Sequence, residues 1–437
     1  MPHAACPFIR LPLLLLVAGW TASAAPAITD VERAALRAQA ERCRRLLDQT
    51  VTDFYLPACV DTVHGGYLEN LRDGRFAPTG EKFLTLQARQ LWFFSTLAEA
   101  GLRREEALRA ARSGYDFIER HFRDAGRGGY FAKVADDGRP ADTRKHAYLN
   151  AFALYGLVAF HRATGERAPL EAARRLFEAL DHYAHDSAHG GYHEFFQADW
   201  QPVTNRAEAG YVGAIGVKTY NTHLHLLEAF AELYRVWPDP PLRERLAELV
   251  QINTATVRDP VHGCNLDAWH PDWRGLGEPR NPPPSYGPPA GCAGLGLGAV
   301  QTPGRPLAPY RSWAEALVDY SLEHGYDRRH GGFFYGGSLG ATADDLKKEW
   351  WVQAEALVGM LDLYRLTGNR RYLEVFAQTL DFIERHQVAA EGGWWATREA
   401  DGSRHANRSR TSMWQGAYHN GRALLFSAQR LEAMARQ

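Results

Sequence analysis

A glycine doublet followed by an aromatic residue recurs at nearly even intervals along this chain of 437 residues. The doublets begin at Gly65, Gly128, Gly190, Gly331 and Gly392, with a degenerate copy at Gly263. Successive copies lie 63, 62, 73, 68 and 61 residues apart, which is typical of a repeated supersecondary unit. Because glycine readily adopts positive φ in tight turns, each doublet is predicted to form the same loop on the same face of a closed array.

Apolar residues between the doublets fall at helical spacing, as in Phe83, Leu86, Leu91, Phe94 and Leu97. Each interval has room for two helices. A first set is expected to begin near Lys82, Ala147, Thr219, Tyr286, Lys348 and Gln415, and a second set near Glu105, Pro169, Pro241, Ala308, Arg371 and Asp30. Since the amino-terminal helix supplies the partner of the last one, the sequence predicts an all-α fold. This fold is an (α/α)6 barrel of six helical hairpins, with the first set inside.

The first residues of the chain have the pattern of an export signal. Arg10 precedes the apolar run Leu11 to Ala18, and Ala22-Ser23-Ala24 has the form cut by signal peptidase. The run is too short to remain as a membrane-spanning helix. We therefore expect a signal peptide over residues 1–24, one barrel domain over residues 25–437, and a periplasmic or secreted protein. The net charge of −1 offers no electrostatic case for a nucleic-acid or membrane partner.

Polar residues on the inner helices are the candidates for a site, because inner helices of a barrel point their ends into one funnel. His223 and His225 lie two apart, roughly 200° around a helix, so they face opposite ways and cannot share a metal ion. Asn221 lies four residues from His225 on one face, which favours His225 as the histidine in the funnel and His223 as a structural residue. His182 and His185 are spaced for a metal, but they close an outer helix, where histidine satisfies terminal carbonyl groups. No metal site is expected.

Several inner-helix segments together resemble the N-acylglucosamine 2-epimerase family, and most of all its cellobiose 2-epimerase branch. The most specific segments are Gln87-Ala88-Arg89, Asn221 through Glu228, Trp351 through Glu355, and Tyr418-His419-Asn420-Gly421-Arg422. The resemblance runs from about residue 30 to 435 and implies the (α/α)6 barrel already indicated by the glycine repeat. It also implies a sugar 2-epimerase or isomerase that works without a cofactor on a small-molecule sugar of the cellobiose or mannose type, as a monomer or homodimer.

The resemblance also implies roles for individual residues. His419 matches one of two acid/base histidines that move the C2 proton of an open-chain aldose through an enediolate, and a group with near-neutral pKa suits that task. Arg89 matches the cation beside the developing oxyanion. The remaining matches are sugar-positioning groups and aromatic walls: His225, Asn221, Tyr148, Glu355, Trp351 and Trp414. We count His225 with His419 and Arg89 as the catalytic candidates, while Glu355 has the alternative of a buried acid paired with an arginine.

The chain departs from the family pattern at the second histidine. That residue belongs to Ser-Tyr-Gly-His-x-x-Glu, whereas this chain reads Ser285-Tyr286-Gly287-Pro288-Pro289-Ala290-Gly291. The stretch that follows, to Gly304, is rich in glycine where a helix is expected, and glycine costs about 1 kcal/mol per helical position. Either the protein has lost its second base and part of its barrel wall, or the sequence from Pro288 to Gly304 is locally out of frame. A genuine Pro288 would suppress two-base epimerisation more than one-base aldose–ketose isomerisation.

Two other functions remain open from the sequence. The first is an inverting glycoside hydrolase, because the same barrel hosts enzymes that use two carboxylates across a sugar bond. It requires a second funnel acid opposite Glu355, and the sequence suggests no convincing one. The second is a non-catalytic sugar-binding relic, which a genuine Pro288 would favour.

Overall fold

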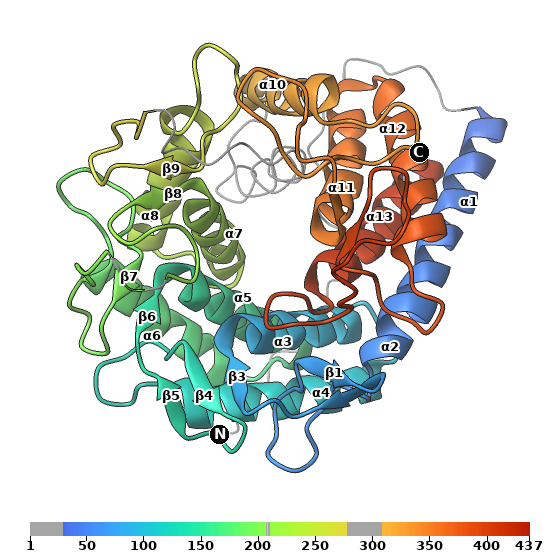
Figure 1. The fold of residues 1–437 in the computed structure, drawn as a ribbon. Helices are drawn as coiled ribbons and strands as arrows, with labels where there is room; N and C mark the ends of the chain where they lie inside the picture. The colour runs from blue at the N-terminus through green and yellow to red at the C-terminus, as the bar shows by residue number, and fades with distance from the viewer. Residues whose placement is uncertain (1–28, 207, 209, 278–307) are drawn as a thin grey trace, which may run out of the picture.

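Two concentric layers of helices form the protein in the computed structural model, which describes residues 29–206, 208, 210–277 and 308–437 (Figure 1). The inner layer contains α3 (Leu84–Glu99), α5 (Ala147–Thr164), α7 (Tyr220–Val236), α11 (Trp350–Thr367) and α13 (Tyr418–Arg436). The outer layer contains α1 (Asp30–Leu46), α4 (Arg104–Phe117), α6 (Arg167–Tyr183), α8 (Pro240–Gln251), α10 (Ala308–His324) and α12 (Arg371–Phe382). The expected signal peptide and the inner helix expected near Tyr286, the fourth of its set, lie outside the described residues.

The ring closes through the two ends of the chain. The outer helix α1 packs along α13, and α13 in turn contacts α3, so the last inner helix takes its outer partner from the amino terminus (Figure 1). A capping box begins α1, since the Thr29 hydroxyl accepts from Glu32 N–H while the Glu32 carboxylate accepts from Thr29 N–H. Over the described residues, the prediction of an all-α barrel of paired helices is confirmed.

The two layers differ in how their helices are buried. Fifteen residues of α5 are buried, on all sides of the helix, as expected for an element enclosed by neighbours. The outer helix α6 buries six residues along one stripe, among them Leu176, Phe177 and Leu180. Four outer helices are extended or followed by π-helical turns: η2 (Leu47–Thr52), η3 (Ile118–Phe122), η4 (Ile252–Thr256) and η5 (Ile383–Gln387); a short helix α2 (Asp53–Tyr55) follows η2.

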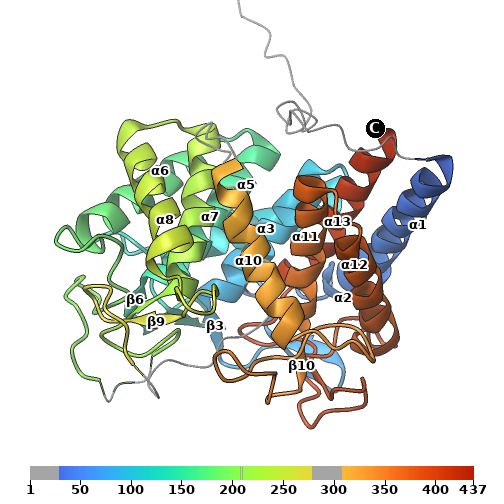
Figure 2. The same ribbon diagram turned by 90° about the horizontal axis from the view of Figure 1, so that it is seen from above.

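Short strands link consecutive repeats at the end of the barrel where the inner helices begin (Figure 2). A strand that leads into an inner helix pairs antiparallel with a strand beyond the next doublet turn. The linking strands are β3 (Glu81–Phe83), β4 (Lys133–Ala135) and β5 (Pro140–Asp142) in one sheet, and the pairs β6 (Lys145–His146) with β7 (Phe195–Phe196), β8 (Lys218–Thr219) with β9 (Ala268–Trp269), and β10 (Lys348–Glu349) with β11 (Thr397–Arg398). A separate hairpin joins β1 (Asn70–Arg72) to β2 (Arg75–Ala77).

These strands correct the expected starts of several inner helices. Lys82, Thr219 and Lys348 are not helical but lie in β3, β8 and β10, because each is paired with a strand of the next repeat. Gln415 lies in the loop before α13, which begins at Tyr418. The helices begin only one to three residues later than expected, so the periodicity located the elements and missed the strand that precedes each one.

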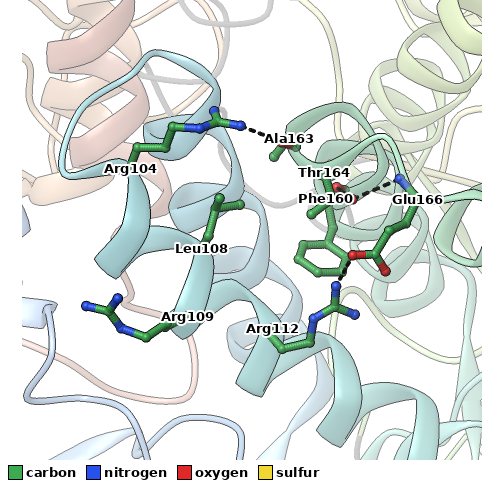
Figure 3. A pocket seen from close by; sticks show the side chains of 8 residues that line it. All are labelled: Arg104, Leu108, Arg109, Arg112, Phe160, Ala163, Thr164 and Glu166. Atoms are coloured by element: carbon green, nitrogen blue, oxygen red, sulfur yellow. Dashed lines mark hydrogen bonds and ion pairs between the residues drawn. The ribbon is translucent and has the colours of Figure 1, made fainter.

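The outer wall contains a cavity of about 440 Å³ between α4 and the carboxyl end of α5 (Figure 3). Two of its three arginines are engaged by the protein. The Arg112 guanidinium pairs with the Glu166 carboxylate and lies 4.6 Å from the centre of the Phe160 ring, while Arg104 donates to the carbonyl oxygen of Ala163 at 3.4 Å. These contacts fasten the first hairpin to the second.

A buried lysine closes the doublet turn in four of the repeats. Its ammonium group donates to an aspartate carboxylate just before the glycines, at 2.7 Å in the pairs Lys82–Asp61, Lys145–Asp124, Lys218–Asp186 and Lys348–Asp327. In the sixth repeat, the Arg410 guanidinium donates to the carbonyl oxygen of Gly392 at 2.6 Å. Because an unpaired buried charge destabilises the folded state, each lysine–aspartate pair stabilises its turn.

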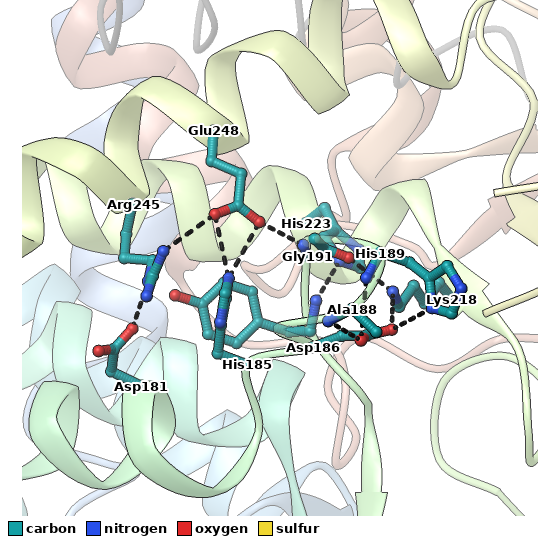
Figure 4. Close-up of polar contacts among 12 residues, drawn as sticks. Asp181, His185, Asp186, Ala188, His189, Gly191, Lys218, His223, Arg245 and Glu248 are labelled. Carbon is teal, nitrogen blue, oxygen red and sulfur yellow. Dashed lines mark hydrogen bonds and ion pairs between the residues drawn. The ribbon is translucent and has the colours of Figure 1, made fainter. Parts of the chain in front are cut away.

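A side chain five positions after each of these lysines binds the other half of the turn. The side chains of Gln87, Asn150, His223 and Gln353 accept the backbone N–H of the aromatic residue that follows the doublet, at 2.7 to 2.9 Å. Figure 4 shows this arrangement in the third repeat, where His223, Lys218 and Asp186 converge on the loop at Gly191. The second glycine has φ of +74° there, and a Cβ atom would lie 2.7 Å from His223 Nε2. Glycine is therefore required by both backbone and space.

Within residues 29–277 and 308–437, apart from 207 and 209, no helix is both long and apolar enough to cross a membrane. The same residues contain no cluster of three or more His, Cys, Asp or Glu side chains arranged for a metal ion.

Candidate active site

His419 and Glu355 form a hydrogen-bonded pair at the centre of the barrel. Glu355 lies on α11, and His419 lies in the first turn of α13. His419 Nδ1 and Glu355 Oε1 are 2.7 Å apart, and both side chains are almost fully buried. Because an ionised carboxylate can only accept, His419 Nδ1 carries the hydrogen and Nε2 keeps its lone pair. His419 is thereby held in the tautomer of a base.

Arg422 joins this pair to a second acid. Its guanidinium, 1% exposed, pairs through Nη2 with Glu355 and donates through Nη1 to Glu228 Oε1 on α7 at 2.8 Å. The Tyr418 hydroxyl also lies 3.0 Å from both Glu228 oxygens. Glu355 is thus an acid paired with an arginine, as one interpretation of the sequence held, and it also orients His419.

His225 forms a matching pair with Glu228 on the same helix. His225 Nδ1 lies 3.1 Å from Glu228 Oε2, one helical turn away. The imidazole also packs edge-on against the Tyr148 ring, with ring centres 5.1 Å apart, and against Phe152 at 4.6 Å. We call His225, Glu228, Glu355, His419 and Arg422 the central cluster.

Arg89 extends from α3 to the edge of the central cluster. Its Nη2 donates to the Tyr148 hydroxyl at 2.8 Å, and its Nη1 donates to the backbone carbonyl of Trp414 at 2.7 Å. The guanidinium carbon lies 4.3 Å from the centre of the Phe152 ring. These contacts fix a permanent cation beside the Tyr148–His225 pair.

Aromatic side chains surround the polar groups. The centres of the Trp351 and His419 rings are 6.2 Å apart, and the Trp414 ring lies 6.3 Å from Tyr148 and 4.8 Å from Phe83. Trp414 lies in the loop before α13 and not on the helix itself. Trp351 and Trp414 are half-buried, in contrast to the central cluster, so they lie nearer to solvent.

Asn221 begins α7 one turn before His225 and is half-buried. Its backbone N–H donates to Asp267 Oδ1 at 3.0 Å. Seven of the eight predicted site residues therefore form two groups in direct contact, which Arg422 and Glu228 join, and Asn221 lies one turn before His225 on α7. Their action on a substrate stays a prediction.

Burial and the neighbouring charges set the protonation state of His419, His225 and Glu355. Burial lowers the pKa of His419 to about 4, although the hydrogen bond to Glu355 raises it. Burial also lowers the pKa of His225, against the effect of Glu228. Both imidazoles are therefore mainly neutral near pH 7. Burial opposes ionisation of Glu355, but Arg422 and the bond from His419 outweigh it and hold the Glu355 pKa at about 2.

His223 has a structural role, as the spacing predicted. Its Nδ1 lies 2.7 Å from the carbonyl oxygen of Thr219, and its Nε2 accepts the N–H of Tyr192 at 2.9 Å. Both ring nitrogens are engaged, and burial lowers its pKa to about 3. On the outer wall, His185 Nε2 lies 3.0 Å from Glu248 (Figure 4), and His182 packs against Tyr183.

Two members of the central cluster were not predicted from the sequence. Glu228 and Arg422 both fell inside motifs that resemble the family, but neither was selected. Glu228 follows His225 by three residues on the same face of α7, and this spacing could have identified it. Glu228 also corrects the expectation that the funnel has no second acid near Glu355, since Arg422 binds both carboxylates.

Comparison with known proteins identifies the family. The sequence profile described as N-acylglucosamine 2-epimerase (GlcNAc 2-epimerase) matches residues 65–283 and 301–423. The chain belongs to the N-acylglucosamine 2-epimerase family. The family is catalytic and consists of carbohydrate isomerases, so the sugar 2-epimerase class inferred from the motifs is confirmed. Residues 284–300, which the profile leaves unmatched, include Pro288 and most of the segment where the sequence departs from the family pattern.

Individual relatives cover nearly the whole chain. A cellobiose 2-epimerase from Bacteroides fragilis is 30% identical over 389 residues, which is 87% of this chain and 96% of that protein. The human N-acylglucosamine 2-epimerase is 26% identical over 94% of both chains. The solved structure of cellobiose 2-epimerase from Spirochaeta thermophila has a TM-score of 0.82 and 30% identity, covering 93% of this chain and 99% of that one. These likenesses agree with the (α/α)6 barrel.

Proposed function

We propose that the protein moves the proton on C2 of an open-chain aldose, with neutral His419 as a base, and that its substrate is a sugar of the cellobiose or mannose type. The observation that carries the proposal is the His419–Glu355 hydrogen bond, which leaves His419 Nε2 free to accept a proton. The carbonyl group at C1 makes the C2 proton removable, and the electron pair left behind forms an enediolate.

Arg89 is suited to the developing oxyanion. It is a buried cation whose position is fixed by Tyr148 and by the Trp414 carbonyl, so it stabilises negative charge without reorganising. The half-buried rings of Trp351 and Trp414 supply apolar surfaces for the faces of a sugar. Asn221, Tyr148 and His225 supply hydrogen-bonding groups for its hydroxyls.

The central cluster argues against the inverting hydrolase. Such an enzyme needs one protonated carboxyl as general acid. Arg422 binds both Glu228 and Glu355 and lowers the pKa of each, so neither member of this pair holds a proton near pH 7.

The test is an NMR experiment in D₂O with cellobiose and with mannose. We expect loss of the C2 proton signal and formation of the 2-epimer or the ketose, with no released monosaccharide from cellobiose. His419→Gln should reduce formation of the 2-epimer or the ketose by about 10²- to 10⁴-fold, the usual contribution of an acid/base group. Release of glucose from cellobiose, or no exchange at C2 in either sugar, would contradict the proposal. Sequencing the DNA that encodes residues 281–305 would decide whether Pro288 is genuine.

Export is a separate part of the proposal. The leader pattern ending at Ala24 supports a periplasmic or secreted enzyme. Mass measurement of the protein from the native host should find a mature chain beginning at Ala25 or Pro26, and a full-length cytoplasmic chain would contradict it.

A further inference from the structure

An epimerase needs a second proton carrier, and the histidine that the family pattern has for this role is absent from this chain. Inversion at C2 requires one group to remove the proton and another to return a proton from the opposite face. From residue 271 to residue 323 the sequence contains no histidine, and this stretch includes the place where the family pattern has its second one. If the chain inverts C2 with two histidines, the second must come from another part of the chain.

The ring of inner helices places α7 across from α13. Among the inner helices that the structure describes, α7 is the third and α13 the last along the chain, and they stand on opposite sides of the ring (Figure 1). His225 comes from α7 and His419 comes from α13. The two helices meet at the ion pair between Glu228 on α7 and Arg422 on α13. His225 lies three residues before Glu228, and His419 lies three residues before Arg422. Both imidazoles therefore lie one turn nearer than this ion pair to the end where the inner helices begin.

The two histidines have matching surroundings. Each is hydrogen-bonded through Nδ1 to a carboxylate, and the two carboxylates share the Arg422 guanidinium. His223, two residues away on α7, lacks this arrangement because both of its ring nitrogens hold the Gly191 turn. A carboxylate behind an imidazole fixes its tautomer and stabilises its protonated form, which a group that exchanges a proton in both directions needs.

We propose that His225 is the second proton carrier of this enzyme, acting on the face of C2 opposite His419, with Glu228 as its positioning residue. This proposal rests on the proposed function. His419 Nε2 accepts the C2 proton, and the C–H electron pair becomes the C1–C2 double bond of the enediolate, with negative charge on O1. His225, which is mainly neutral near pH 7 and takes up a proton from water before the reaction, then donates that proton to the other face of C2, and the C1 carbonyl group reforms.

The charges balance over this cycle. His419 ends protonated and His225 ends neutral, which is the state needed for the reverse reaction. Proton exchange with water restores the starting state. A one-base isomerase differs, because His419 alone would carry the proton between C2 and C1 on one face, and His225 would only bind the sugar.

Deuterium exchange separates these two mechanisms. Each sugar is incubated separately with the enzyme in D₂O. Two pairs of C2 epimers are used: glucose and mannose, and cellobiose and its 2-epimer. The unmodified protein should invert C2 and incorporate deuterium there. His225→Gln should lower inversion by at least about 10²-fold while one epimer still loses its C2 proton, because His419 can remove a proton and return a deuteron on its own face. His419→Gln should leave exchange only in the other epimer.

Two further variants control for a structural effect. Glu228→Gln keeps the size of the side chain and should reduce exchange of the epimer that depends on His225 more than exchange of the other. A general loss of packing would reduce both equally. His223→Gln should leave both exchange reactions unchanged, because glutamine already fills the equivalent place at Gln87 and Gln353.

Each contrary outcome has a distinct meaning. Inversion by His225→Gln at the unmodified rate, or equal loss of exchange in both epimers, would overturn the role of His225 as a proton carrier. Exchange and ketose formation without inversion by the unmodified protein would overturn it too, while leaving the proposed function in place. No exchange at C2 by the unmodified protein would overturn the proposed function itself.

Discussion

His223 on α7 occupies the place that Gln353 occupies on α11. Each lies five positions after a buried lysine, and each accepts the backbone N–H of the aromatic residue after a glycine doublet, at 2.9 Å for His223 and 2.7 Å for Gln353. The same position is filled by Gln87 and Asn150 in the first two repeats. A histidine in a motif shared with sugar epimerases thus belongs to the repeat that builds the barrel.

This equivalence predicts that His223→Gln makes the protein less sensitive to acid. Burial lowers the pKa of His223 to about 3, whereas an unfolded chain has a histidine pKa of about 6.5. As the pH falls below about 6.5, the unfolded state binds a proton that the folded state refuses, so stability is lost until the pH reaches the folded pKa. Between pH 7 and 4.5 the variant should lose about 2 kcal/mol less unfolding free energy than the unmodified protein.

Urea denaturation at a series of pH values measures this difference. At pH 7 the two proteins should differ by no more than about 1 kcal/mol, because glutamine keeps the hydrogen bond to Tyr192. Parallel pH curves for the two proteins would show that His223 is not held neutral by the fold.

The helices of the barrel could be predicted from the sequence because their signals are local. Helical spacing of apolar residues and a turn repeated at the glycine doublets are properties of short segments, and they located the starts of the described helices within three residues. Trp351 with Glu355 and Asn221 with His225 were also placed correctly on shared faces. The central cluster could not be predicted from local spacing, because Arg422 binds Glu228 from across the ring. No local spacing relates α7 to α13.

One residue of the motifs that resemble the family serves the fold. Gln87 stands beside Arg89 in a segment typical of the family, but its side chain binds the N–H and carbonyl groups of Tyr67 and holds a turn. The expected start of α3 at Lys82 failed for a related reason. Lys82 reaches back to Asp61 from a strand that pairs with the next repeat, and this contact spans segments that the sequence shows only as separate turns.

Gly332 and Gly368 offer a matched pair for measuring how much the doublet turn matters. Both have positive φ, +78° and +73°, but a Cβ atom at Gly332 would lie 2.7 Å from Gln353 Oε1, whereas nothing lies within 4 Å at Gly368. Gly368→Ala should cost about 1–2 kcal/mol for the left-handed backbone alone. Gly332→Ala should cost a further 1–3 kcal/mol, on the order of an overpacked core. Equal losses in urea denaturation would mean that Gln353 moves away without cost.

Arg422 is predicted to be needed for stability as well as for the site. Arg422→Met leaves Glu228 and Glu355 buried near each other without their shared cation. Breaking a buried ion pair on one side typically costs about 3–5 kcal/mol. Adding Glu228→Gln and Glu355→Gln to Arg422→Met removes both charges and should restore much of the unfolding free energy. If the triple variant is no more stable than Arg422→Met, lost packing of the arginine explains the effect and charge does not.

The pH dependence of turnover provides a test of the link between Glu355 and His419. A base works only when deprotonated, and the His419 pKa of about 4 predicts that kcat/KM falls as the pH drops through that value. Glu355 raises the His419 pKa against the effect of burial. Glu355→Gln should therefore move the acid limb to lower pH. It should also reduce the plateau rate, on the order of 10²-fold, because His419 becomes a weaker base with an unfixed tautomer.

Glu194→Gln is the matched control for this measurement. Glu194 is buried and binds Thr219 and Thr222, and burial raises its pKa to about 8, so it is already largely protonated near pH 7. Replacing it by glutamine changes no charge there and should leave the acid limb where it is. An acid limb that moves to higher pH in Glu355→Gln, or that moves equally in both variants, would mean that the limb reports another group and that Glu355 does not set the basicity of His419.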